Sequence, residues 1–226
     1  MLQNSTIPQR NNSILGEVRR PTCICSISKQ IALIVRDSSI SMTGPKAQEA
    51  STGCNELVSE LALPGNKDGF YVGIVDFSQD AHIANPITAA KYLAGMMNPI
   101  SVSSSTNITA GLQQAINLLQ SPVPEQDVNC SFLRPVVILL SDGQHNCGNP
   151  PEVVASQLKD IADLVTVAFG SDADEALLCR LATSPEHFYR CRDGRELRRF
   201  LIAVGDTLKD TRKAGVNATD PLRQVK

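Results

Sequence analysis

Short apolar runs alternate with amphipathic runs along most of this chain, from about residue 30 onward. Runs of mainly apolar residues predict buried strands at 31–35, 70–77, 136–140 and 164–169. A further run at 83–88 predicts an edge strand that pairs antiparallel with 70–77. Strands that alternate with helices are typical of a mostly parallel sheet whose two faces are both covered.

Helical spacing fills the intervals between these strands. Apolar residues recur at helical spacing after Pro45, which suits a first helical turn, and again over 108–119. Further helices are predicted near 91–97, from Pro150 to about 162, and after Asp172 and Asp193, each followed three residues later by a glutamate. The expected buried positions of the first and last helices are Ala47, Ala50, Cys54, Leu57, Val58, Leu61, Leu197, Phe200, Leu201 and Val204.

These elements predict a doubly wound α/β fold, with a mostly parallel sheet, one antiparallel edge strand and helices on both faces. The chain has 226 residues, which suits one domain with short tails. We expect a flexible segment over 1–28, one domain over 29–210 and a flexible tail over 211–226, because both ends are polar.

Charge and composition narrow the classes of partner. The formal net charge is −2, which argues against a nucleic-acid partner, and no apolar run is long enough for a membrane span. Residues 1–20 lack the apolar centre of a signal peptide, so we expect a cytoplasmic protein with mainly reduced cysteines. The seven cysteines are an odd number, and Cys23 and Cys25 form their only tight pair, which is a weak metal or redox signal.

Candidate chemistry begins where the first predicted strand ends. Asp37, Ser39 and Ser41 form a D-x-S-x-S run, whose side chains point the same way if the backbone stays extended. Carboxylate and hydroxyl oxygens suit Mg²⁺, Mn²⁺ or Ca²⁺ rather than Zn²⁺. The alternative interpretation is that this run only caps the next helix or ties a turn.

Two later segments favour the metal interpretation. Thr106 lies in a Ser/Thr-rich loop before the predicted helix 108–119. Asp142 follows the apolar run 136–140, with Gly143 next to let the chain turn. Ligands of open α/β sheets bind beyond the carboxyl ends of strands, where both Asp37 and Asp142 are expected.

These residues resemble the metal-ion-dependent adhesion site (MIDAS) of the von Willebrand factor A (VWA) domain family. That site uses a D-x-S-x-S run, a threonine in a loop like this one, and an aspartate in an apolar-strand-then-D-G motif. Five residues match those positions in order, and the resemblance covers about 29–210 and implies a VWA/Rossmann-like fold. The five residues are Asp37, Ser39, Ser41, Thr106 and Asp142.

The resemblance also implies roles for these residues. Ser39 and Ser41 would ligate a Mg²⁺ ion, or Mn²⁺ or Ca²⁺, directly. Thr106 would ligate directly or through water, and Asp37 and Asp142 mainly through water. Because neutral hydroxyls leave the cation under-neutralised, an Asp or Glu of a protein partner can complete its shell. The predicted function is a metal-dependent protein–protein interaction module rather than an enzyme.

One residue departs from the family pattern. The family usually has glycine at the fourth position of the first motif, where this chain has Ile40. A β-branched residue resists a positive φ. We therefore expect either a shifted loop or an isoleucine exposed beside the metal.

Two enzyme classes fit less well. A Mg²⁺-dependent phosphotransfer enzyme of the haloacid dehalogenase kind needs a second carboxylate where Ser39 stands. Dinucleotide binding needs G-x-G-x-x-G after the first strand, which is missing. His145 is the best acid–base candidate, although a loop histidine is more often a surface residue.

Size and layout resemble the bacterial stand-alone VWA proteins associated with tellurite resistance (TerY-like). That resemblance implies a stress-response system in which the partner is a protein kinase or a PP2C-type phosphatase. The alternative is an accessory VWA subunit of a chelatase or AAA+ machine.

Overall fold

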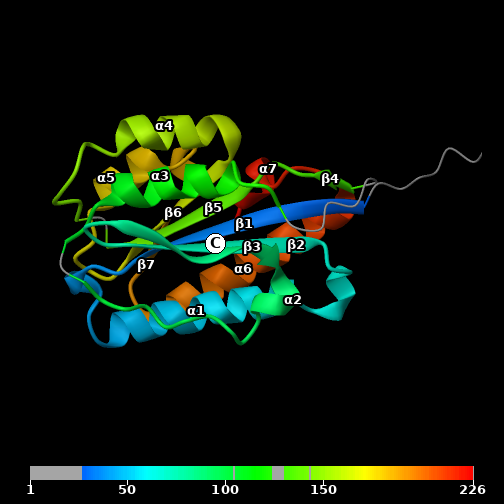
Figure 1. Cartoon of the computed structure of the whole chain (residues 1–226), viewed down its shortest axis with the longest axis horizontal. Helices are drawn as coiled ribbons and strands as arrows, with labels where there is room; N and C mark the ends of the chain where they lie inside the picture. The colour runs from blue at the N-terminus through cyan, green and yellow to red at the C-terminus, as the bar shows by residue number, and fades with distance from the viewer. Residues whose placement is uncertain (1–26, 104, 124–129, 143, 226) are drawn as a thin grey trace, which may run out of the picture.

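The computed structural model describes residues 27–103, 105–123, 130–142 and 144–225, in which one sheet separates two layers of helices (Figure 1). One layer consists of α3 (Ile108–Leu119), α4 (Glu152–Ile161) and α5 (Glu175–Leu181). The other consists of α1 (Pro45–Leu61), α2 (Ala90–Leu93) and α6 (Gly194–Ala214).

The sheet has the predicted doubly wound topology. Its strand order is β3-β2-β1-β5-β6-β7, with β4 paired to the beginning of β1. Only β3 runs antiparallel to its neighbour among the described strands, which confirms the predicted fold class. The strands are β1 (Ile27–Asp37), β2 (Phe70–Phe77), β3 (Ala81–Ala89), β4 (Cys130–Phe132), β5 (Val136–Ser141), β6 (Asp163–Phe169) and β7 (Phe188–Cys191).

Two hydrophobic cores lie on the two faces of the sheet. Every residue of β2, β5 and β6 is buried, because helices cover both faces of these strands. The core beneath α1 and α6 includes all ten predicted core positions of these helices, and the core beneath α3 to α5 is separate. The amphipathic patterns that predicted α1, α3 and α6 are thus confirmed.

The segment after β3 differs from the prediction. A helix was expected near 91–97, but α2 ends at Leu93, and Gly95 takes a positive φ of 73°. The following residues run beside α1 as irregular chain (Figure 1). Two polar contacts anchor them: Ile100 N donates to Ser51 Oγ at 3.0 Å, and Arg36 Nη1 donates to Asn98 O at 3.1 Å.

The C-terminal end also differs, because the loose tail expected from residue 211 is folded as far as the structure describes it. Helix α6 continues to Ala214, and Gly215 ends it with a left-handed φ of 69°. A short helix α7 (Thr219–Leu222) follows, and its Leu222 is buried in the core. The apolar residues of this end were too few to show a helical period in the sequence.

Smaller predictions had mixed outcomes. Asp193 caps α6 through its carboxylate, as predicted. The cap of α5 is Asp174, whose Oδ1 accepts from Leu177 N at 2.9 Å, so the expectation for Asp172 was wrong.

Cys23 and Cys25 lie outside the described residues, as does nearly all of the predicted segment 1–28. Within the described chain, no helix has the length and apolar character to cross a membrane.

Candidate metal centre

The carboxyl ends of β1 and β5 meet at one edge of the sheet, which we call the carboxyl edge. The two strands pair in parallel, with Arg36 opposite Leu140. Asp37 therefore lies beside Ser141, and the Ser141 hydroxyl donates a hydrogen bond to Asp37 Oδ2. The structure thus brings Asp37 and Asp142 to the same edge, as the sequence predicted.

The D-x-S-x-S run is ordered by its own hydrogen bonds. Ser39 N donates to Asp37 Oδ1 at 2.8 Å, and the Ser39 and Ser41 hydroxyl oxygens are 2.9 Å apart. Asp37 and Ser39 are buried, whereas Ser41 is half-buried. Ser38 belongs to the scaffold instead, because its hydroxyl donates to Phe77 O at 2.8 Å. The two serines of the motif therefore hold their hydroxyl groups together next to Asp37.

Ile40 fits its loop without left-handed backbone. It begins a short 3₁₀ turn, Ile40–Met42, and its side chain is 67% exposed. Within the described chain, the non-glycine residues with positive φ are Lys67 and Asp68. The backbone at Ile40 therefore needs no positive φ, and of the two expected outcomes the structure shows the exposed isoleucine.

Thr106 is buried in a loop that is tied to both strand ends. Its N–H donates to Asn146 Oδ1 at 2.9 Å, and Asn146 N donates back to Thr106 O at 3.0 Å. Ser103 N in the same loop donates to Ser38 O at 2.7 Å. These bonds place Thr106 between the segment after β1 and the segment after β5.

His145 supports the beginning of α3. Its Nδ1 accepts from Ile108 N at 3.2 Å, and the Asn107 side chain accepts from Ala110 N at 3.1 Å. Both residues satisfy backbone N–H groups that lack a partner in the first turn of a helix. His145 therefore uses one ring nitrogen for structure, which argues against the acid–base role considered for it.

Asp142 has a carboxylate oxygen without a partner. Among the described residues, its Oδ1 receives a long bond of 3.4 Å from Gln144 N, and its Oδ2 is buried and has no hydrogen-bond partner. Its backbone is fixed more firmly, because Asp174 N donates to Asp142 O at 2.7 Å. A buried unpaired carboxylate oxygen is costly, so this orphaned atom points to a missing positive partner.

The electrostatics of the two carboxylates agree with that interpretation. Neither Asp37 nor Asp142 forms an ion pair with a described Lys or Arg. Burial raises the pKa of Asp37 to about 6, the charge of Asp142 adds to the rise, and the bonds from Ser141 and Ser39 oppose it. Two carboxylates and several hydroxyls, with no cluster of three His, Cys, Asp or Glu in the described chain, fit a hard divalent cation.

Sequence reasoning missed three supporting residues. Ser141 bonds to Asp37, Asn146 fixes Thr106, and Arg36 forms a buried ion pair with Asp76 beside the site. Ser141 directly precedes Asp142 at the end of an apolar run, which is a readable signal. Asn146 and the Arg36–Asp76 pair carry no local pattern, because they depend on contacts between distant segments.

Comparisons with known proteins agree with this fold. The human inter-alpha-trypsin inhibitor heavy chain H6 is 28% identical over 179 residues, covering 72% of this chain and 13% of that protein. Human calcium-activated chloride channel regulator 4 is 26% identical over 175 residues, covering 74% of this chain and 18% of that protein. This chain thus spans less than a fifth of the length of these curated relatives.

Among solved structures, proximal thread matrix protein 1 from the mussel byssus, with a zinc-occupied MIDAS motif, has a TM-score of 0.65 at 23% identity. That match covers 80% of this chain and 48% of the mussel chain. The pilus adhesin SpaC from Lactobacillus rhamnosus GG has a TM-score of 0.68 at 14% identity, covering 82% of this chain and 30% of the adhesin chain. The TerY-like subtype finds no support in these comparisons.

The family model of the von Willebrand factor type A domain matches residues 32–201, which is most of the chain and includes all five candidate ligands. This family's domain is a metal-dependent protein-interaction module. The chain belongs to the von Willebrand factor type A domain family.

Proposed function

We propose that the carboxyl edge binds one divalent cation and uses it to capture an acidic residue of a protein partner. Ser39 and Ser41 would ligate the cation directly, and Thr106 directly or through water. Asp37 and Asp142 would act mainly through water. The observation that carries the proposal is the buried, unpaired Asp142 Oδ2 beside a second carboxylate that has no ion pair with a described residue.

We propose Mg²⁺ as the cation, with Mn²⁺ or Ca²⁺ as alternatives. Hydroxyl and carboxylate oxygens are hard ligands, which Mg²⁺ prefers. The mussel protein with a zinc-occupied MIDAS motif supports a divalent cation at this place in the fold. Zinc is therefore a competitor to include in a binding experiment.

Partner capture follows from the charge of such a centre. Hydroxyl ligands are neutral, and carboxylates that act through water neutralise a dication only in part. An Asp or Glu of a partner would supply the missing charge through a short, directional bond. Ile40, 67% exposed at the same edge, would contact the partner next to that carboxylate.

The same residues argue against an enzyme. Ser39 stands where a phosphotransfer enzyme needs its second carboxylate, and His145 Nδ1 accepts from a backbone N–H. Binding of a carboxylate requires no nucleophile or general base. A kinase–phosphatase system of the tellurite-resistance kind, a chelatase or AAA+ machine and a cytoplasmic location stay predictions, and metal-dependent capture does not depend on them.

The test begins with a pull-down from native lysate with and without EDTA. The affinity of an isolated partner is then measured in Mg²⁺ and in EDTA, for wild type and Thr106→Ala. We expect EDTA to abolish binding, and Thr106→Ala to weaken partner binding more than metal binding. Thr207→Ala, on α6, is the matched control. Equal affinity in Mg²⁺ and EDTA would place the interface elsewhere and reject the metal bridge.

A further inference from the structure

Strand β7 leaves one edge of the sheet open. Among the described strands it pairs only with β6. Gly170 N donates to Cys191 O at 2.9 Å, so the peptide groups of Cys191 face β6. Backbone groups alternate sides along a strand. The N–H and C=O of Arg190 and the C=O of Phe188 therefore point away from β6.

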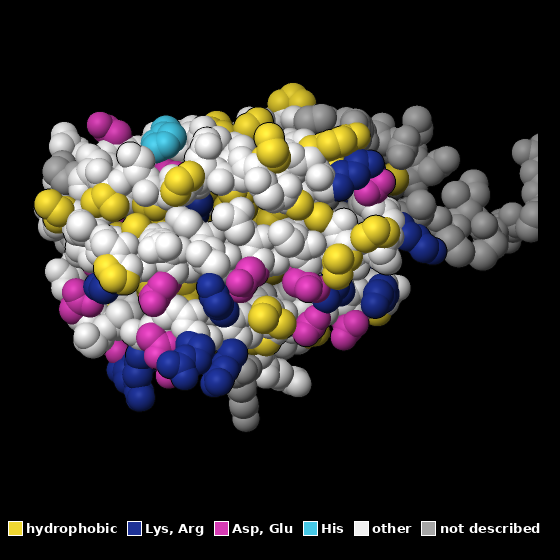
Figure 2. All heavy atoms as spheres, turned by 90° about the horizontal axis from the view of Figure 1, so that it is seen from below, with side chains coloured by type: hydrophobic (Ala, Val, Ile, Leu, Met, Phe, Trp, Pro, Cys, Tyr) yellow, Lys and Arg dark blue, Asp and Glu magenta, His cyan; other side chains and the backbone are white. Residues whose placement is uncertain are grey.

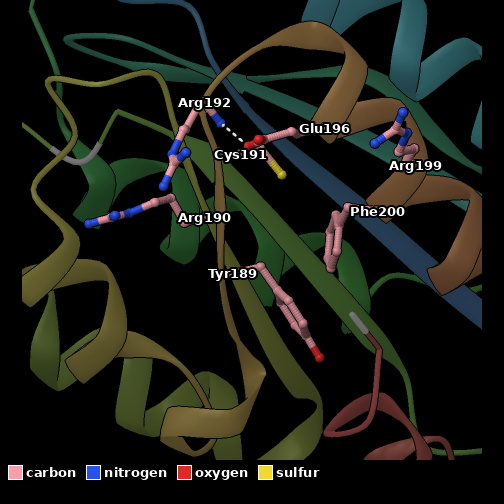
Figure 3. Close-up of a pocket in the computed structure, with 7 residues that line it drawn as sticks. All are labelled: Tyr189, Arg190, Cys191, Arg192, Glu196, Arg199 and Phe200. Atoms are coloured by element: carbon pink, nitrogen blue, oxygen red, sulfur yellow. Dashed lines mark hydrogen bonds between the residues drawn. The ribbon is translucent and has the colours of Figure 1, made fainter.

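A hollow of about 420 Å³ lies between this strand and α6. Figure 3 shows Tyr189 and Cys191 directed toward Phe200 on one side of β7, and Arg190 and Arg192 directed to the other side. The Tyr189 and Phe200 rings pack with centroids 4.4 Å apart, and the Cys191 thiol is buried. Of these four side chains, the two on the side of Phe200 are thus apolar or aromatic, and the two on the other side are arginines.

Positive charge is concentrated around this hollow. Residues 189–200 contain five arginines and two acidic residues, in a chain whose net charge is −2. Arg192 and Arg199 are exposed and form no ion pair within the described chain, whereas Arg190 pairs with Glu175. Glu196 accepts from Arg192 N at 2.8 Å. Figure 2 shows dark blue side chains gathered at the lower left of the face that includes α1 and α6.

We propose that this open edge docks an extended segment of a protein partner in which acidic and apolar residues alternate. The segment would lie beside β7 and bond to the outward groups of Phe188 and Arg190. Its apolar side chains would enter the hollow near Phe200, and its acidic side chains would face Arg190 and Arg192.

Two observations define this occupant. Apolar and basic side chains alternate over residues 189–192, so a segment with alternating apolar and acidic residues would complement them. The four residues of β7 offer few backbone hydrogen bonds to a docked segment. The arginines must therefore supply much of the discrimination between acidic segments and other segments. Residues 1–26 of this chain carry three arginines and one glutamate, so their charge does not complement the site.

The probe is an acetylated and amidated peptide, Glu-Val-Glu-Val-Glu-Val-Glu, titrated into the full-length isotope-labelled protein and followed by NMR. The buffer contains EDTA, so that the peptide carboxylates cannot bind through a metal at the carboxyl edge. We expect the largest shift changes at the amides of 188–192 and at Arg199. A peptide of the same composition in blocks, and one with Lys for Glu, should bind at least about tenfold more weakly.

Arg190→Pro tests the strand pairing, because it removes an outward N–H and leaves the β6-facing groups in place. It should weaken the peptide about tenfold relative to Arg190→Ala, which keeps the N–H. The double variant Arg192→Glu with Arg199→Glu should weaken peptide binding further. Lys209→Glu, on α6 like Arg199, should not weaken it. Equal binding of the block peptide, displacement by inorganic phosphate or an oligonucleotide, or equal affinity of the two Arg190 variants would overturn the proposal.

Discussion

Two buried acidic centres involve adjacent residues of β1, Arg36 and Asp37, and they differ in how their charge is compensated. Asp76 on β2 receives two bonds from the buried Arg36, at 2.7 Å and 2.8 Å, and Arg36 also donates to Asn98 O. Within the described chain, Asp37, the next residue on β1, receives its bonds from the neutral groups of Ser39 and Ser141. Its neighbour Asp142 has one carboxylate oxygen without a hydrogen-bond partner among the described residues.

This difference indicates which pair stabilises the fold and which pair is available to bind a ligand. The charges of Arg36 and Asp76 compensate each other, so this pair stabilises the fold without any ligand. The Asp37–Asp142 pair is buried to the same degree but lacks a positive partner in the described chain. We infer that the first pair holds β1 to β2, and that the second is kept for a cation from solution.

The largest expected effect follows from breaking the compensated pair. Arg36→Met leaves Asp76 buried without its cation, so the free energy of unfolding should fall by about 3–5 kcal/mol. Urea unfolding measures the loss, which should be the same in Mg²⁺ and in EDTA. The double variant Arg36→Met with Asp76→Leu should recover most of it, and a loss below about 1 kcal/mol in the single variant would contradict this assignment.

Removing a charge from the Asp37–Asp142 pair should weaken metal binding without destabilising the metal-free protein. Asp37→Asn keeps the acceptor for Ser39 N but removes the charge, so Mn²⁺ affinity should fall about 10- to 100-fold. The stability of the metal-free protein should not fall, because a buried charge has been removed. Calorimetry and urea unfolding measure the two quantities, with Asp210→Asn, exposed on α6, as control. Unchanged Mn²⁺ affinity would show that the site is elsewhere.

Metal should stabilise the protein without being needed for folding, because two hydrophobic cores already cover the sheet. At 100 times its dissociation constant, a bound ion adds about 2.7 kcal/mol. The melting temperature should then rise by about 5–10 °C. Circular dichroism in Mg²⁺ and in EDTA measures this shift, which Asp37→Asn should lose. Global unfolding in EDTA would mean that the metal is structural.

The smallest effect is expected at Ile40. Since Ile40 has no left-handed φ, glycine relieves no strain there and costs about 0.5–1 kcal/mol more to order. Ile40→Gly should therefore weaken Mn²⁺ binding about two- to fivefold, with Ile40→Ala between it and wild type. Tighter binding in the glycine variant would show that isoleucine strains the loop after all.

The sequence predicted the parts of this molecule that depend on local pattern. Periodicity located α1, α3, α6 and the central strands, and the carboxyl ends of β1 and β5 placed Asp37 and Asp142 at one edge. It could not predict that Arg36 would bond to Asp76, because these residues are 40 positions apart. It also missed β7, because its four residues, Phe188–Cys191, are too few to show a strand pattern.

Crystals soaked in Mn²⁺ and measured at an anomalous wavelength test the central claim most directly. We expect one anomalous peak at the carboxyl edge, about 2.0–2.3 Å from the Ser39 and Ser41 hydroxyl oxygens, with Asp37 and Asp142 behind it. The peak should vanish in crystals of Asp37→Asn. Absence of a peak at that edge in the wild type, with Mn²⁺ bound at another site, would contradict the account.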